Sequence, residues 1–475
     1  MNPLRTPLVL LLLGSAMMAS ASEKPNIIFM MLDDCSAVEF SCYATDKHPA
    51  AQTTPEVDNL AGEGLRFETC WATPMCKPTR ALLMSGKYAY QTRQYGNHLS
   101  GAGDDFAILH KPVSKVMQEN GYRTAISGKW HLPGFPYQEE YGWDEWSMLG
   151  GYIGPNNLNI TWDGPWFTWK NCTEYLHEKA VIRKNGNKYP SLHWNGCVIE
   201  NGKLLPSDAD TYGPDLNHKF ALDFIERHKD EPFYLYYPCV LPHKPWMRTP
   251  EAPAGMESNV RMGETYLKQL VDKLKETGIY DRTIVFFTAD NATQGYGKGV
   301  TSEMGTRVPL IVFGGPVKER GVTRALVDFA DMYPTKLELA GIDPDTVPGL
   351  DGKSFKPVLD DKDDEGKPFI FSYNDTFRTV RTRDHMMDGS GGIWKSSPTG
   401  NILDFKVITD ERKATVIRKR LLKMIEAYPA PTKKDFKKPL YKHGKKPDWP
   451  STDFGTMRYV KMGDNWMKQA DRNEP

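Results

Sequence analysis

The sequence predicts an α/β protein built on a large, mostly parallel sheet flanked by helices. Apolar runs with strand character alternate with segments of helical pattern, and the run from Asn26 to Leu32 is apolar throughout, as in a strand buried on both faces. Polar residues directly follow several of these runs. Because ligands of open α/β sheets bind beyond the carboxyl ends of the strands, these residues predict one common site.

Three helix and strand pairs follow the first strand along the chain. In two of them a glycine stands directly after the helical pattern, where its tolerance of positive φ suits a helix C-terminus. Each strand then opens into polar residues. The pairs are the helix 111–120 with the strand 122–127, the helix 214–228 with the strand 233–237, and the helix 263–277 with the strand 283–288.

Oxygen donors dominate the polar residues at these strand ends. Asp33 and Asp34 follow the first strand, and Asp290 and Asn291 follow the strand 283–288. Singly, each could be a helix cap or a solvated loop residue. Together they suit a hard cation, calcium or magnesium rather than zinc. Further candidates at strand ends are Lys129, His131 and His243.

The segment Cys76 to Gly86 predicts an anion-binding helix start. Pro78 suits the first turn of a helix because it has no amide hydrogen to lose, and four apolar residues continue the helical pattern. Cys76 then lies at a helix N-terminus, where free N–H groups favour an oxyanion, and Arg80 adds positive charge one turn later. The alternatives for Cys76 are a buried thiol and a disulfide partner.

This segment resembles the signature of the sulfatase family, in which Cys or Ser is followed by x-Pro-x-Arg and, after a short apolar stretch, by Thr or Ser and then Gly. Thr79 departs from the better-known members, which carry Ser or Ala there. The resemblance extends from Asn26 to about Pro357. The other matching segments, in the family's order, are Asp33-Asp34, Gly128-Lys129-Trp130-His131, Pro242-His243-Lys244-Pro245, Asp290-Asn291, and Lys298-Gly299 with Glu303, Gly305 and Arg307-Val308-Pro309.

The resemblance implies an alkaline phosphatase-like fold: a large mixed, mostly parallel sheet, with a smaller C-terminal α+β domain of antiparallel sheet and helix. It also implies that a formylglycine-generating enzyme oxidises Cys76 to Cα-formylglycine, whose hydrated aldehyde is the nucleophile. One calcium ion is the implied cofactor. Its implied ligands are Asp33, Asp34, the modified Cys76, Asp290 and Asn291.

The expected reaction is hydrolysis of a sulfate monoester, with a sulfated carbohydrate as the expected substrate. Negative charge grows on the bridging oxygen as the S–O bond breaks, so the site needs cations and an acid. Two alternatives stay open: a phosphonate or phosphate ester hydrolase of the same superfamily, and a non-catalytic protein that binds sulfated glycans. The expected roles are charge stabilisation by Lys129, Lys298 and Arg80, with Arg80 also orienting the diol, proton acceptance by Asp290 and then by His131, and leaving-group protonation by His243, helped by Lys298.

The stretch 143–212 holds six tryptophans among Gly, Asn and Pro, with little periodicity, and is expected to be a loop-rich insert. Trp162 and Trp166 are candidates for a wall that packs on a sugar ring. The alternative is a loop held to the domain by its own tryptophans.

Residues 1–21 predict a signal peptide cleaved after Ala21, and hence a protein exported to the periplasm or secreted. No later apolar run is long enough to span a membrane, and 60 basic residues against 60 acidic ones do not indicate nucleic-acid binding. The expected domains are a catalytic domain over 22–360 and a smaller one over 361–475. In the latter, strands over 368–373, 377–381 and 405–409 and a helix over 412–427 precede a basic tail.

Seven cysteines are compatible with export but do not fix a disulfide pattern. Cys172 and Cys197 lie in the same predicted insert and are the easiest pair to imagine. Buried free thiols are the alternative.

Overall fold

The computed structural model describes residues 24–48, 50, 52–97, 102–103, 105–153, 158, 189–361, 366–397 and 400–432, and the short strands β6 (Trp166–Phe167), β21 (Tyr459–Met462) and β22 (Asn465–Lys468). The predicted signal peptide and the basic residues from 433 to 446 lie outside the described residues. Among the helices that are described, none is long and apolar enough to span a membrane.

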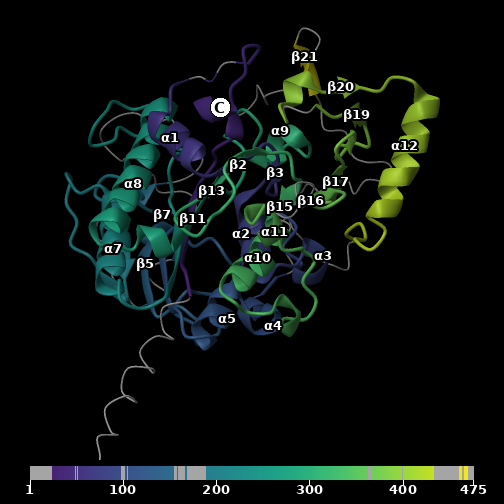
Figure 1. Ribbon diagram of the computed structural model, residues 1–475. Helices are drawn as coiled ribbons and strands as arrows, with labels where there is room; N and C mark the ends of the chain where they lie inside the picture. The colour runs from purple at the N-terminus through teal and green to yellow at the C-terminus, as the bar shows by residue number, and fades with distance from the viewer. Residues whose placement is uncertain are drawn as a thin grey trace, which may run out of the picture.

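A mixed sheet of ten described strands forms the centre of the molecule (Figure 1). Its five central strands are parallel, and antiparallel strands adjoin them on both sides. This arrangement confirms the predicted α/β fold with a mostly parallel sheet. The strand order is β14 (Gly321–Thr323), β2 (Leu65–Phe67), β13 (Leu310–Phe313), β11 (Thr283–Ala289), β1 (Asn26–Leu32), β10 (Phe233–Pro238), β4 (Arg123–Gly128), β5 (Glu145–Leu149), β8 (Val198–Glu200) and β9 (Lys203–Leu204).

The strand β1 lies in the middle of the parallel part, and every residue in it is buried. In register, Phe29 lies between Tyr236 of β10 and Phe286 of β11. The rings of Phe29 and Phe286 stack with centroids 5.7 Å apart. A strand covered on both faces has no side facing water, which explains why its sequence is apolar without alternation.

Helices cover both faces of the sheet (Figure 1). The predicted helices 111–120 and 214–228 are confirmed as α5 and α7. The predicted helix 263–277 begins earlier than expected, at Met256, so that Gly263 lies inside it. A glycine suits this position because the helix packs closely on β1: a Cβ there would come 3.3 Å from Leu32. One face carries α1 (Pro55–Glu63), α7 (Gly213–Arg227) and α8 (Met256–Glu276), and the other carries α2 (Cys76–Ser85), α5 (Val113–Glu119) and α10 (Met332–Leu339).

The stretch 143–212 is less loop-like than predicted, because its two ends contribute β5, β8 and β9 to the central sheet. Trp143 is buried and stacks on Tyr234 and Tyr236 of β10 with centroids 5.9 and 6.2 Å apart. Trp143 is therefore a core residue. The thiol of Cys197 is buried and free, and Cys172 lies outside the described residues.

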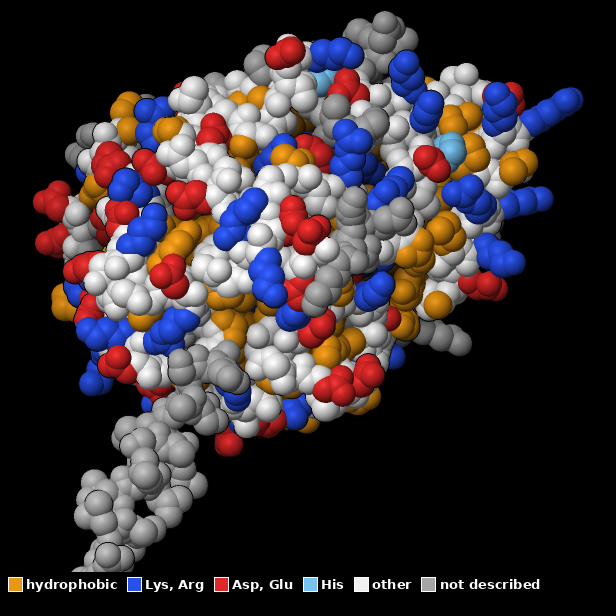
Figure 2. Space-filling model, in the orientation of Figure 1, with side chains coloured by type: hydrophobic (Ala, Val, Ile, Leu, Met, Phe, Trp, Pro, Cys, Tyr) orange, Lys and Arg blue, Asp and Glu red, His pale blue; other side chains and the backbone are white. Residues whose placement is uncertain are grey.

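The C-terminal part forms a separate antiparallel sheet with one helix, as the resemblance implied. The predicted strand 405–409 is reduced to two residues. Figure 2 shows Lys and Arg side chains gathered over this part, and α12 carries several of them. The elements are β16 (Ile370–Asn374), β17 (Phe377–Arg381), β18 (His385–Met387), β19 (Ile393–Lys395), β20 (Lys406–Val407) and α12 (Glu411–Met424).

A buried ion-pair cluster joins this sheet to the rest of the molecule. The ammonium group of Lys367, just before β16, lies 2.7 Å from Asp328 and 2.9 Å from Asp331. Asp328 also accepts a hydrogen bond from the backbone N–H of Phe371 in β16. The start of the C-terminal sheet is thus anchored in the interior of the larger part.

Candidate active site

The polar residues predicted from the strand ends come together at the carboxyl edge of the parallel strands. Because adjacent parallel strands end side by side, residues far apart in the sequence become neighbours there. Nearly all of these side chains are buried. Four adjacent strands contribute: Asp290 and Asn291 follow β11, Asp33 and Asp34 follow β1, His243 follows β10, and Lys129 follows β4.

Hydrogen bonds fix the ends of β1 and β11 to each other. The backbone N–H of Asp34 donates to Asp290 Oδ1 at 3.1 Å, and Asn291 Nδ2 donates to Asp34 Oδ1 at 2.8 Å. The side chains of both strand ends therefore form one rigid group.

The helix α2 places Cys76 against this group. The Sγ atom of Cys76 lies 3.6 Å from Oδ1 of Asp33 and 3.6 Å from Oδ1 of Asp34. Arg80, one turn later, lies 2.7 Å from Asp290 Oδ2 and 3.6 Å from Asp33 Oδ2. The predicted helix start is confirmed, and its first turn is aimed at the carboxylates.

Thr79, the departure from the better-known pattern, anchors the start of this helix. Its hydroxyl donates to the carbonyl of Asp290 at 2.7 Å and lies 2.7 Å from the hydroxyl of Thr73. The branched side chain is fully buried. The hydroxyl therefore fixes α2 to the end of β11.

Glycine at position 128 allows Lys129 to reach the site. Gly128 has φ 125°, and a Cβ there would lie 2.2 Å from the carbonyl oxygen of Pro238. The chain therefore turns tightly after β4, and Lys129 N–H donates to that same carbonyl at 2.8 Å. The ammonium group of Lys129 is hydrogen-bonded to Asp33.

The charges of the site balance before any ion is added. Three carboxylates, those of Asp33, Asp34 and Asp290, are paired with three cations. Lys129 pairs with Asp33, Lys298 Nζ lies 2.6 Å from Asp34, and Arg80 pairs with Asp290. A bound divalent cation would give the site a net positive charge, which favours an anionic ester.

The donor set fits a hard cation. One ligand atom each from Asp33, Asp34, Cys76 and His243 lies within 4.8 Å of the others. The Oδ1 atom of Asn291 is buried without a hydrogen-bond partner in the described part of the chain, although its Nδ2 is bonded. This oxygen is therefore free to coordinate a cation. Carboxylate and amide oxygens favour calcium or magnesium.

The thiol of Cys76 is not activated. Burial raises the pKa of Cys76 well above its usual value, and Asp290 adds to the rise. Reactive cysteines have the opposite property, a lowered pKa that yields thiolate. The unmodified thiol of Cys76 is therefore a poor nucleophile.

The three carboxyl groups differ in pKa. Burial alone would raise the pKa of Asp33 and of Asp34, but nearby cations, led by Lys129 and Lys298 respectively, hold both below their usual values. Burial and the charge of Asp33 raise the pKa of Asp290. Asp290 is therefore the carboxylate best suited to accept a proton.

The two histidines of the motifs face the same centre with lowered basicity. His243 Nδ1 lies 2.5 Å from the carbonyl of Lys244, so it is the protonated nitrogen, and Nε2 lies 3.6 Å from Asp34 Oδ2. Burial and Lys129 lower the pKa of His243 and, much further, that of His131. His131 has φ 52° and a buried Nδ1 without a partner among the described residues.

Tyr152 is a site residue that the sequence patterns did not reveal. Its ring lies 4.6 Å from the ammonium of Lys129 and 5.3 Å from the ring of His131. Its hydroxyl is buried and has no hydrogen-bond partner in the described segments, and burial raises its pKa well above the usual value. Tyr152 therefore keeps a proton to donate to a ligand. Only the two glycines before it, which mark a turn, gave any signal.

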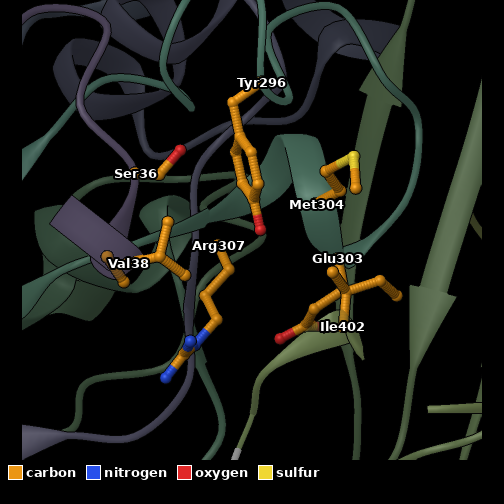
Figure 3. Close-up of a pocket in the computed structure, with 8 residues that line it drawn as sticks. Ser36, Val38, Tyr296, Glu303, Met304, Arg307 and Ile402 are labelled. Carbon is orange, nitrogen blue, oxygen red and sulfur yellow. The ribbon is translucent and has the colours of Figure 1, made fainter. Parts of the chain in front are cut away.

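In the motif block after Lys298, the other residues have structural roles. Glu303 accepts a hydrogen bond from Trp71 Nε1 at 2.8 Å and pairs with Arg381 of the C-terminal sheet. Figure 3 shows Glu303, Arg307 and Tyr296 around a cavity beside this contact. Its volume of about 10 Å³ holds at most one water, so it is no substrate site.

The two tryptophans predicted to form a sugar wall are not among the described side chains. Trp162 lies outside the described residues, as does the side chain of Trp166 in β6. Trp146 is buried like Trp143, whereas Trp194 is half-buried. The structural alternative therefore holds for two of the six tryptophans.

The sheet and the charged site at its carboxyl edge define a protein of the alkaline phosphatase-like class. The family model for sulfatases matches residues 25–342, so the chain belongs to the sulfatase family.

Similar proteins are sulfatases with different substrates in their names. The chain is 28% identical over 374 residues to an ulvan-active sulfatase of Formosa agariphila, covering 78% of this chain and 63% of that protein. It is 26% identical over 404 residues to human N-acetylgalactosamine-6-sulfatase, covering 77% and 72%.

Solved structures share the fold. The PsFucS1 sulfatase from Pseudoalteromonas sp. superposes with a TM-score of 0.62 at 20% identity, over 88% of this chain and 93% of that one. A phosphonate monoester hydrolase from Silicibacter pomeroyi superposes with a TM-score of 0.56 at 14% identity, over 86% and 96%.

Proposed function

We propose that this protein hydrolyses sulfate monoesters of carbohydrates, with Cys76 converted to Cα-formylglycine by a formylglycine-generating enzyme and with one calcium ion bound. The observation that carries the proposal is the position of Cys76: its Sγ lies 3.6 Å from two carboxylates that are themselves paired with Lys129 and Lys298. An unactivated thiol at that position has no use as a nucleophile. A residue with two hydroxyl groups there could attack and later release sulfate.

The calcium ion would be held by Asp33, Asp34, Asp290, Asn291 and the modified residue 76. When bound, it supplies positive charge to a sulfuryl oxygen and lowers the pKa of the hydroxyl beside it. The orphaned Asn291 Oδ1 supports this ligand set.

The other residues stabilise charge and move protons. Arg80 is fixed by Asp290 and by the carbonyl of Lys129, so it can orient the side chain of residue 76 one turn before it. Lys129 and Lys298 counter the negative charge of the sulfuryl group. Asp290, with its raised pKa, accepts the proton of the attacking hydroxyl.

Leaving-group protonation is the role proposed for His243. Because Nδ1 is directed at the Lys244 carbonyl, the nitrogen that faces the site is Nε2, which carries a proton only in the imidazolium form. Burial and Lys129 lower the pKa of His243 in the free protein, and the negative charge of a bound sulfate ester would favour the imidazolium form. Lys298, whose pKa is raised by Asp34 against the effect of burial, stays protonated and can assist. His131, kept neutral by burial and Lys129, takes the proton of the second hydroxyl so that sulfate is eliminated.

The carbohydrate substrate is supported by the relatives, which are named for ulvan and for N-acetylgalactosamine 6-sulfate. Export to the periplasm or outside, by a signal peptide over 1–21, would place the protein with such polymers. A wall formed by Trp162 and Trp166 is a further part of this proposal. It predicts that Trp162→Ala lowers activity on a sulfated sugar while activity on a small aryl sulfate is kept.

A phosphonate or phosphate ester hydrolase is the second candidate, favoured by the fold shared with the phosphonate monoester hydrolase. Kinetics on sulfate, phosphate and phosphonate esters with the same leaving group separate the two. We expect the largest kcat/KM on the sulfate. A larger value on the phosphonate would overturn the proposal.

A further inference from the structure

The loop that follows His243 carries two cations, Lys244 and Arg248, that do not belong to the cluster of Asp33, Asp34 and Asp290 with their paired cations. Arg248 Cζ lies 3.8 Å from the centroid of the Trp194 ring, and Lys244 Nζ lies 5.0 Å from that of Trp246. Neither cation forms an ion pair with a carboxylate in the described part of the chain, in contrast to Lys129 and Lys298, which do. Both therefore have unused capacity for an anion.

The indole rings that hold these cations are themselves fixed. Trp194 Nε1 donates to the carbonyl of Arg248 at 2.8 Å, and the Trp194 ring packs on Tyr212 with centroids 5.0 Å apart. Trp246 Nε1 donates to the carbonyl of Pro242 at 2.9 Å. A guanidinium held over a ring face by a cation–π contact does not use its N–H donors in that contact. Arg248 is exposed, so an incoming ligand can reach it.

Both cations lie in the loop that follows His243, and this loop contacts the segment that contains Trp194. Lys244 directly follows His243, and its carbonyl accepts from that histidine. In that segment, His193 precedes Trp194, and the charge of His243 adds to the effect of burial in lowering the pKa of His193 to about 3. Both ring nitrogens of His193 are buried without a partner among the described residues. The segment 193–194 and the loop 243–248 are thus neighbours.

We propose that Lys244 and Arg248 bind a second anionic group of the substrate, on the sugar that carries the cleaved sulfate or on the sugar beside it. This inference rests on the proposed sulfatase function and makes the substrate class a multiply anionic glycan. The second group is a sulfate or a carboxylate, because the planar fork of arginine binds either with two parallel hydrogen bonds. Arg80, Lys129 and Lys298 are already paired with carboxylates. A second anionic group of the substrate is therefore attracted more strongly by cations that have no carboxylate partner.

The test measures kinetics and binding for sugars that differ only in their second anionic group, with variants that each lack one of the two cations. The substrates are 4-nitrophenyl sulfate, a monosulfated disaccharide, and the same disaccharide with either a second sulfate or a uronate carboxylate. The variants are Arg248→Gln, Lys244→Met and the double variant. The control is Arg261→Gln, because Arg261 is also exposed but lies on α8. Binding of the same sugars to the Cys76→Ala protein by calorimetry gives a readout that needs no turnover.

We expect the wild-type protein to prefer a doubly anionic sugar, and each variant to lose roughly five- to tenfold of that preference in KM and in Kd. Turnover of 4-nitrophenyl sulfate by Arg248→Gln should stay unchanged, and Arg261→Gln should behave as wild type. The sulfate and carboxylate substrates show which anion is bound. Equal binding of singly and doubly anionic sugars by the wild-type protein would overturn the inference. Absence of turnover with intact preference in binding would instead overturn the proposed function alone.

Discussion

The guanidinium of Arg80 lies 2.7 Å from a carboxylate oxygen of Asp290, and both side chains are fully buried. This pair joins the first turn of α2 to the end of β11, and so fixes the position of Cys76 relative to the carboxylates. A buried pair contributes less to stability than its geometry suggests, but removing one partner is costly.

Asp290→Asn should therefore lower both activity and stability. Loss of the proton acceptor should reduce kcat roughly 100-fold or more. Loss of the shorter of the two carboxylate contacts of the buried Arg80 should lower the free energy of unfolding by about 3 kcal/mol. Asp272→Asn, which removes only an exposed partner of Lys268, should leave the free energy of unfolding nearly unchanged. Urea unfolding and steady-state kinetics measure both. Similar stability losses in the two variants would contradict the account.

His243→Ala should affect substrates according to their leaving groups. A sugar alkoxide needs protonation, so kcat/KM on a sugar sulfate should fall roughly 100- to 10,000-fold, whereas 4-nitrophenolate leaves without help. His131→Ala is the matched comparison. It should lower kcat on both substrates alike, because release of sulfate from the enzyme is common to them. Equal losses on both substrates for His243→Ala would remove the acid role.

Removal of the proposed metal ion should destabilise the protein, because an ion that binds only the folded state adds to its stability. We expect chelation to lower Tm and added calcium to restore it in a concentration-dependent way. Asn291→Ala should weaken this calcium effect about tenfold or more, because one ligand oxygen is lost. A Tm that does not respond to calcium in the chelated wild-type protein would contradict the metal site.

Lys367→Met should loosen the C-terminal sheet. It leaves Asp328 and Asp331 buried side by side without their cation, which should lower the free energy of unfolding by about 3–5 kcal/mol. Lys356→Met removes a half-exposed partner of Asp360 and should cost less than about 1 kcal/mol. Denaturant unfolding compares the two. A small loss for Lys367→Met would show that the cluster does not hold the two sheets together.

Glu264 should make stability depend on pH. It accepts the backbone N–H of Val57 at the start of α1, and burial raises its pKa to about 7. The native state therefore keeps a proton that the unfolded chain releases above about pH 4.3. The resulting stabilisation is complete below that pH and is lost as the pH rises through about 7.

Relative to wild type, Glu264→Gln should thus gain stability between about pH 5 and about pH 8.5, because the variant has no proton to lose. Urea unfolding at both pH values measures the gain. A difference between variant and wild type that does not change with pH would contradict the role assigned to Glu264.

The parallel core and the clustering of polar residues at its carboxyl edge could be predicted because local patterns encode them. An apolar run such as Asn26 to Leu32 identifies a buried strand, and the residues after it then fall at the site. Tyr152 could not be predicted, because its role depends on contacts with Lys129 and His131 that no local pattern encodes.

Residue type alone also does not show whether a side chain acts in the site or packs in the core. Trp143 and Trp146 belong to the stretch that was expected to be a loop-rich insert, but both are buried, Trp143 against β10 and Trp146 within β5. Glu303 lies in the same motif as Lys298, yet it joins two sheets while Lys298 faces the site. Only the tertiary contacts separate these cases.

The central claim is that converted Cys76 is the nucleophile of a sulfatase. The most direct measurement is mass spectrometry of the Cys76 peptide, made alongside turnover of 4-nitrophenyl sulfate on samples with different degrees of conversion. We predict a mass lower by about 18 Da and a kcat proportional to the converted fraction, with no turnover by Cys76→Ala. Turnover by unconverted protein, or its absence in fully converted protein with calcium, would contradict the account.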